Sequence, residues 1–73
     1  MSTTTASIEI TLNGRRRAVP DGLTLTGLLE HLGVHPRLVV VEWNREIIRH
    51  ERYSEITVRD GDIIELVHFV GGG

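Results

Sequence analysis

A chain of 73 residues with a formal net charge of −2 suffices for one small domain and has no overall attraction to nucleic acid or acidic lipid. With 40% hydrophobic and 25% charged residues, its composition is that of a soluble globular protein, and no apolar run approaches the roughly 20 residues of a membrane-spanning helix. The sequence contains neither cysteine nor lysine, which excludes disulfides, thiolate catalysis, cysteine metal sites, and Schiff bases or isopeptide bonds on its side-chain amines.

The first seven residues, MSTTTAS, have neither the basic stretch nor the apolar core of a signal peptide. We expect residues 1–7 to form a flexible N-terminal tail and the protein to remain in the cytoplasm. The folded domain is then expected over residues 8–70.

A β-hairpin is predicted at the start of this domain. Apolar and polar residues alternate over residues 8–12, which gives a strand with one apolar face. Asn13-Gly14 follows at once, and both residue types tolerate the positive φ angles of a type I′ turn. The return strand is expected over residues 15–19 and should end at Pro20, which has no N–H to donate to a strand ladder.

A short helix is predicted next, because the hydrophobic period changes to that of a helix. Four leucines fall on one helical face: Leu25, Leu28, Leu29 and Leu32. Thr24 is the expected N-cap residue, and Gly33 is the expected left-handed residue that ends the helix. A helix this short is not stable alone, so its apolar face must pack on a sheet.

A second set of strands follows the helix. Residues 38–43, LVVVEW, form a β-branched run of strand length. Asn44-Arg45 can then turn the chain into a short segment around Ile47 and Ile48.

The remaining chain is irregular until its last strand. Residues 49–54 are charged, residues 55–58 are expected as a brief strand or a turn, and the RDGD sequence at 59–62 is a turn by composition. Residues 63–70 form the longest strand-like run of the chain. The resulting ββαββ order predicts an α+β protein with a β-grasp fold, in which one main helix packs on one face of a mixed sheet.

Strand alternation predicts an exposed apolar patch near the end of the chain. If Glu65 faces water, Val67 and Phe69 lie on the same outer face, and the same parity places Val40 and Glu42 outward. If the two strands are neighbours, these residues form a partner-binding patch beside the last glycines. The alternative is that Phe69 folds over the sheet edge and covers its own backbone.

The chain ends in three glycines, Gly71, Gly72 and Gly73. Because they have no Cβ, a carboxylate at their end can enter a narrow channel of another protein, and a docking surface must offset the cost of ordering them. The α-carboxylate is an anion at neutral pH and can attack the α-phosphate of ATP when an enzyme aligns the two. A sulfur nucleophile can then displace the nucleotide, and in a chain without cysteine the sulfur atom is expected on Gly73. The alternative is a flexible end or an expression scar without function.

The sequences NREII and RDGDIIELVHFVGGG, with the preceding hairpin and helix, resemble the ThiS family. This is a ubiquitin-like β-grasp family of sulfur carriers for thiamine biosynthesis, and the likeness covers residues 8–73. The chain differs from the family's usual pattern at Arg49-His50 and at Tyr53, positions that bear on the choice of partner and not on the chemistry of the tail.

The resemblance implies a protein cosubstrate rather than an enzyme. Gly73 would be adenylated by a ubiquitin-activating-type enzyme and converted to a thiocarboxylate, with sulfur from a cysteine desulfurase or an equivalent donor. The thiocarboxylate would then be presented to thiazole synthase, and Gly71 and Gly72 would thread the tail into each partner. No cofactor would be bound, and ATP would be consumed by the adenylating enzyme.

Three alternative functions share this fold. The small subunit of molybdopterin synthase carries sulfur in the same way but usually ends without a VHFVGGG sequence. A ubiquitin-like module could dock without using its tail, and a covalent tag would form adducts on lysines of other proteins. The arginine triplet at 15–17 is interpreted as a charged sheet edge and not as a nucleic-acid site, and no metal site is predicted from His31 and His35.

Overall fold

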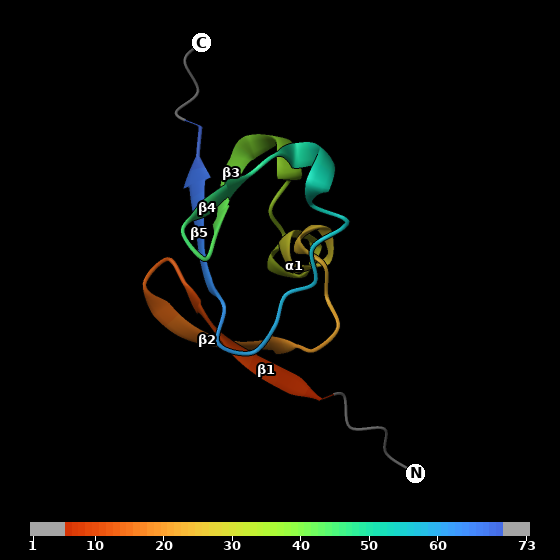
Figure 1. Cartoon of the computed structure of the whole chain (residues 1–73), viewed down its shortest axis with the longest axis vertical. Helices are drawn as coiled ribbons and strands as arrows, with labels where there is room; N and C mark the ends of the chain where they lie inside the picture. The colour runs from red at the N-terminus through yellow and green to blue at the C-terminus, as the bar shows by residue number, and fades with distance from the viewer. Residues whose placement is uncertain (1–5, 70–73) are drawn as a thin grey trace.

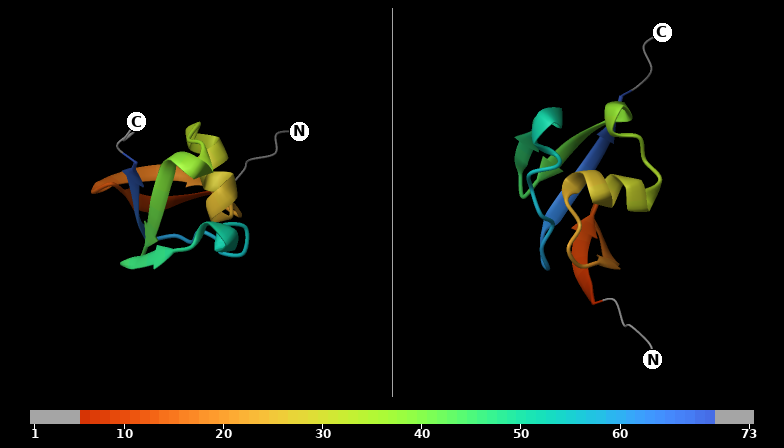
Figure 2. Two further views of the ribbon diagram at one scale, coloured as in Figure 1. Left: turned by 90° about the horizontal axis from the view of Figure 1, so that it is seen from above. Right: turned by 90° about the vertical axis from the view of Figure 1, so that its right-hand side faces the viewer.

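The computed structural model describes residues 6–69, which form a five-stranded mixed sheet in the order β2-β1-β5-β3-β4 with one α-helix against it (Figure 1). β5 is parallel to β1 and antiparallel to β3. Figure 2 shows α1 on one side of the sheet, so the other face is left open. The predicted α+β class and strand–helix order are confirmed, with these bounds: β1 Ser7–Leu12, β2 Arg15–Pro20, α1 Leu25–Leu32, β3 Val39–Trp43, β4 Glu46–Ile48, β5 Ile63–His68, and two short 3-10 helices, η1 Pro36–Leu38 and η2 His50–Arg52.

The first hairpin has the predicted type I′ geometry. Asn13 and Gly14 have φ angles of 50° and 83°, both in the left-handed region. The strands extend one residue further than expected at their open ends, because Ser7 pairs with Pro20. Pro20 is tolerated there since β2 is an edge strand. Ser7 therefore belongs to β1 rather than to a tail, and residues 1–5 of the expected tail lie outside the described residues.

The helix begins and ends at the predicted residues. The Thr24 hydroxyl accepts a hydrogen bond of 3.1 Å from the Gly27 N–H, as an N-cap residue does. Gly33 has φ 73°, and its N–H donates to the Glu30 carbonyl at 3.0 Å. The described residues contain no helix with the length and hydrophobicity needed to cross a bilayer.

One hydrophobic core lies between α1 and the inner face of the sheet. Its buried members are Ile10, Val19, Leu25, Leu28, Leu29, Val39, Val41, Ile48, Tyr53, Ile56, Val58, Ile64 and Leu66. Segment 55–58 enters this core through Ile56 and Val58, although only Thr57 makes a β-bridge, with Thr24. A brief strand and a turn were both expected for this segment. The structure shows a packed connection and no strand.

Two further strand boundaries differ from those predicted. Leu38 belongs to η1 and not to the strand, because Pro36 starts a helical turn whose N-cap is the His35 side chain. The last strand ends at His68, two residues before the expected end; Phe69 follows it, and Val70 lies outside the described residues.

Two turn asparagines hold the central strand β5 from its two sides. The Asn13 Oδ1 accepts a hydrogen bond of 2.8 Å from the Leu66 N–H, beyond the end of the β1–β5 ladder. The Asn44 Oδ1 accepts one of 2.8 Å from the Ile63 N–H, and the Asn44 N–H donates to the Ile63 carbonyl at 2.7 Å. The strand that leads to the C-terminus is thus fixed by backbone-like bonds on both edges.

Asp62 ties the start of β5 to β3. Its carboxylate is 9% exposed and accepts hydrogen bonds from the Trp43 indole N–H at 2.9 Å, the Asn44 amide at 3.1 Å and the Arg59 N–H at 2.9 Å. A buried carboxylate with three donors is well satisfied, so Asp62 has a structural role in the RDGD turn.

Candidate partner-docking site

The predicted outward residues of β3 and β5 lie side by side on the open face of the sheet. Val40 is directly opposite Val67, and Glu42 is directly opposite Glu65. Val67 is 57% exposed, whereas the inward residues Val41 and Leu66 are 0% and 8% exposed. The predicted alternation of both strands is therefore confirmed. We call Val40, Glu42, Val67 and Phe69 the docking face.

Phe69 extends the apolar part of this face beyond the end of β5. Its N–H donates to the Leu38 carbonyl at 3.0 Å, which keeps its backbone in line with the strand. The side chain is 62% exposed. The ring is thus available to another molecule, and the structure favours the exposed patch over the alternative in which Phe69 covers its own backbone.

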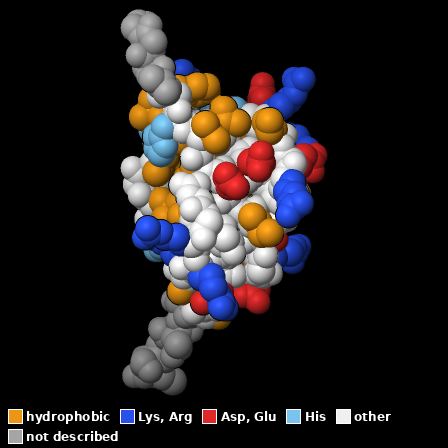
Figure 3. All heavy atoms as spheres, turned by 90° about the vertical axis from the view of Figure 1, so that its left-hand side faces the viewer, with side chains coloured by type: hydrophobic (Ala, Val, Ile, Leu, Met, Phe, Trp, Pro, Cys, Tyr) orange, Lys and Arg blue, Asp and Glu red, His pale blue; other side chains and the backbone are white. Residues whose placement is uncertain are grey.

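Two further isoleucines on this face were not singled out from the sequence. Ile47 of β4 is 69% exposed and pairs with the outward Glu42, and Ile63 of β5 is 41% exposed and shares the parity of Glu65. Figure 3 shows this side of the molecule, with hydrophobic side chains gathered towards one end and two acidic side chains together near the middle. Extending the alternation into the second hairpin was the signal that could have found both isoleucines.

Glu42 and Glu65 form an acidic pair on this face. They are neighbours across the β3–β5 ladder, and neither forms an ion pair with a basic side chain among residues 6–69. Like charges directly opposite each other destabilise an antiparallel pair. The open face of the sheet therefore carries an unfavourable acidic pair among exposed apolar side chains, and one member of the pair, Glu42, belongs to the docking face.

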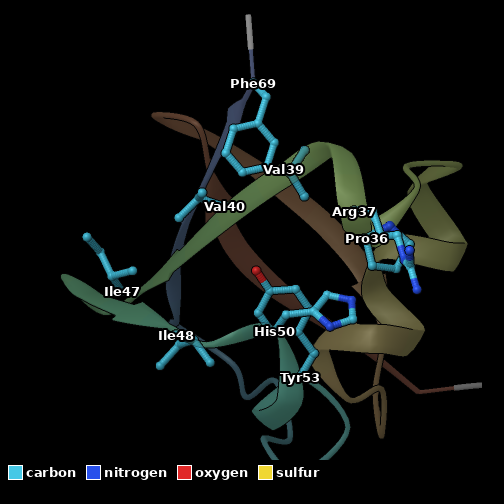
Figure 4. Close-up of a pocket in the computed structure, with 9 residues that line it drawn as sticks. All are labelled: Pro36, Arg37, Val39, Val40, Ile47, Ile48, His50, Tyr53 and Phe69. Atoms are coloured by element: carbon cyan, nitrogen blue, oxygen red, sulfur yellow. The ribbon is translucent and has the colours of Figure 1, made fainter. Parts of the chain in front are cut away.

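Phe69 also lines a groove at the start of β3, with a volume of about 390 Å³ (Figure 4). The other lining residues come from η1, β3, β4 and η2, and most are apolar: Pro36, Arg37, Val39, Val40, Ile47, Ile48, His50 and Tyr53. The groove exists because β4 pairs with β3 only from Val41 onward. At that point the buried Tyr53 hydroxyl accepts a hydrogen bond of 3.2 Å from the Val41 N–H.

The predicted reactive residue, Gly73, and the threading residues Gly71 and Gly72 lie outside the described residues. The structure does place Phe69, four residues before Gly73 in the sequence, next to both the docking face and the groove. A partner that takes up the last residues of the chain must therefore approach these surfaces.

Comparisons with known proteins agree with the C-terminal motifs. The model of the ThiS family matches residues 9–73. The chain is 49% identical over 53 residues to the sulfur carrier protein ThiS of Bacillus subtilis, covering 73% of this chain and 80% of that protein. The crystal structure of the thiamine biosynthesis protein ThiS from Geobacter metallireducens is similar with a TM-score of 0.80 and 38% identity, covering 90% of this chain and 100% of that one.

A longer relative contains a similar region. The chain is 41% identical over 66 residues to a thiazole synthase of Paramagnetospirillum magneticum, covering 90% of this chain but 20% of that protein. The chain thus spans about a fifth of the length of that relative.

Proposed function

Because the chain belongs to the ThiS family, we propose that it is a sulfur carrier and not an enzyme, and that Gly73 bears the sulfur atom. The observation that carries the proposal is that the family match extends to residue 73, so the three terminal glycines are part of the matched region. The absence of cysteine supports it, because a covalently carried sulfur atom then has no thiol side chain to occupy.

The chemistry takes place on the terminal carboxylate. A carboxylate oxygen attacks the α-phosphate of ATP, pyrophosphate leaves, and the carbonyl carbon becomes a mixed anhydride with AMP. A sulfur nucleophile at the oxidation level of sulfide then attacks this carbon, the bond to AMP breaks, and a thiocarboxylate remains. An adenylating enzyme aligns the reacting groups and consumes the ATP, while the carrier itself holds no cofactor.

The acceptor of the sulfur is proposed to be thiazole synthase. In the Paramagnetospirillum magneticum relative, a carrier-like region is part of a thiazole synthase chain. Linking two modules raises their effective concentration towards each other, which is useful only when the two modules act together. A cysteine desulfurase or an equivalent donor supplies the sulfur as a persulfide, and a thiol reductant provides the two electrons that bring it to the oxidation level of sulfide. We propose that all of these steps occur in the cytoplasm.

The docking face supplies the affinity that the tail lacks. Ordering three glycines costs on the order of 1–2 kcal/mol per residue. Burial of a largely exposed Val67 and Phe69 against a partner can offset this cost, since a fully buried apolar side chain contributes about 1.5–3 kcal/mol. Val40 and Glu42 belong to the same contact because they are the neighbours of Val67 and Glu65 in the ladder.

Intact-mass analysis tests the proposal. The full chain is incubated with ATP, its adenylating enzyme and a sulfur donor, and we expect a gain equal to the mass difference between sulfur and oxygen, located in the C-terminal peptide. Omitting ATP should leave the mass unchanged. An unchanged mass with an adenylating enzyme that loads another ThiS protein would contradict the proposal.

A further inference from the structure

We propose that the adenylating enzyme presents an arginine side chain to Glu42 and Glu65, so that the acidic pair is the specificity element of the docking face. This inference rests on the proposed function and adds the chemistry of the partner's surface. Glu65 was not among the residues predicted to bind a partner, and the cross-strand pairing brings it into the site.

The first step is the cost of the acidic pair in the free chain. Glu42 and Glu65 are directly opposite each other in β3 and β5, and neither has a basic partner among the residues described. Among the described acidic residues only Glu9 and Glu55 have ion-pair partners, Arg16 and Arg52, so the feature that distinguishes Glu42 and Glu65 is their position directly opposite each other. Like charges directly opposite each other in a ladder lower stability, and no side-chain hydrogen bond or ion pair among residues 6–69 uses either carboxylate.

The second step is the apolar surroundings of the pair. Ile47 is the neighbour of Glu42 on the β4 side, Val40 and Val67 form the next outward pair along the ladder, and Ile63 lies on the other side of Glu65. A partner that covers these side chains also removes water from both carboxylates. Burying unpaired carboxylates is strongly unfavourable, so such a partner must bring a cation.

A guanidinium suits this geometry best. Opposite side chains of an antiparallel pair have Cβ atoms about 4.5–5.5 Å apart, and the planar fork of arginine can donate to two carboxylates at once. The partner is thus expected to present an apolar surface with an arginine near its centre.

The adenylating enzyme is the partner that most needs this contact. It meets the carrier when the C-terminus is an ordinary carboxylate, which any protein has, so the folded surface must provide the selectivity. A partner that acts after sulfur loading can also recognise the thiocarboxylate.

The test compares Glu65→Arg with Glu30→Arg, which makes the same charge change at an exposed position of α1 on the other side of the sheet. Arginine is used because a new lysine would add an amine that the acyl-adenylate could acylate. In free Glu65→Arg the new side chain faces Glu42, so we expect its melting temperature to rise. Its KM as a substrate of the adenylating enzyme should increase about tenfold or more, with kcat little changed, and the difference should shrink as salt is added.

Each outcome is decisive. Glu30→Arg should leave KM within about twofold of the unsubstituted chain, as expected for a charge outside an interface. If Glu65→Arg also leaves KM unchanged, or fails to stabilise the free chain, the inference is wrong while the carrier function stands. If only transfer from preformed thiocarboxylate to thiazole synthase is impaired, the acidic pair belongs to that partner and the assignment is overturned. If the unsubstituted chain is never adenylated, the proposed function itself fails.

Discussion

Val40 of β3 and Val67 of β5 lie directly opposite each other on the open face of the sheet, although the two residues are 27 positions apart in sequence. This contact makes one apolar surface out of β3 and β5 and places it next to Phe69. A side chain that is buried only in a complex contributes to binding without contributing much to folding.

Replacing Val67 by serine should therefore separate binding from stability. Val67 is 57% exposed, so we expect the free energy of unfolding to change by less than about 0.5 kcal/mol. Binding to the adenylating enzyme should weaken by about 1–2 kcal/mol, because the variant lacks the valine methyl groups whose burial in the complex contributes to affinity. Calorimetric titration and thermal unfolding measure the two effects, with Ala18→Ser on the exposed edge strand β2 as control. A large loss of stability without a loss of binding would contradict this role.

Replacing Asp62 by alanine should destabilise the fold. The Trp43 indole, the Asn44 amide and the Arg59 N–H would each lose their acceptor. Leaving such groups unsatisfied costs about 1–3 kcal/mol each when they stay buried, and water replaces part of the loss here, so we expect about 2–3 kcal/mol in total. For a domain of this size, this lowers the melting temperature by roughly 10–20 °C. Asp62→Asn keeps one acceptor, and its melting temperature should fall between those of the unsubstituted chain and Asp62→Ala. If both variants melt at the temperature of the unsubstituted chain, the structural role of Asp62 is refuted.

Replacing Asn13 by glycine should loosen the last strand. Glycine accepts the φ angle of 50°, so the turn is retained, but the acceptor for the Leu66 N–H is lost. We expect a loss of about 1 kcal/mol and faster hydrogen exchange at the Leu66 amide. Asn13→Asp keeps an oxygen at this position and serves as the matched variant. Equal exchange rates at Leu66 in all three chains would mean that the side-chain bond does not hold β5.

The features that the sequence predicts well depend on neighbours in the chain. The positive φ angles of Asn13 and Gly14, the N-cap at Thr24 and the left-handed Gly33 are all local properties of short segments. Strand alternation is local too, which is why Val67 was assigned to the outer face correctly.

The features that were missed depend on contacts between distant residues. In the sequence, Asp62 has the features of an ordinary turn residue. Its hydrogen bond from the Trp43 indole joins residues 19 positions apart and is formed only in the folded chain. Glu65 was used only to define a face, because its contact with Glu42 follows from the register of two strands that alternation does not fix. The groove beside Phe69 was missed for the same reason. It depends on the pairing of the last residue of β4, Ile48, with Val41, which leaves the first two residues of β3 without a partner in β4.

Removing Gly73 should abolish sulfur loading and preserve docking. The new terminal carboxylate would stand one residue, or about 3.5 Å, short of the position where the enzyme aligns ATP, and in-line attack requires near-contact distances. The shortened chain keeps the docking face, so we expect it to inhibit loading of the full chain competitively, with an inhibition constant close to the KM of the full chain. Gly72→Ala tests the narrow channel separately, because it restores the length but adds a Cβ. A shortened chain that neither loads nor inhibits would mean that docking depends on the tail itself, and one that still performs its cellular role would favour a ubiquitin-like module that only docks.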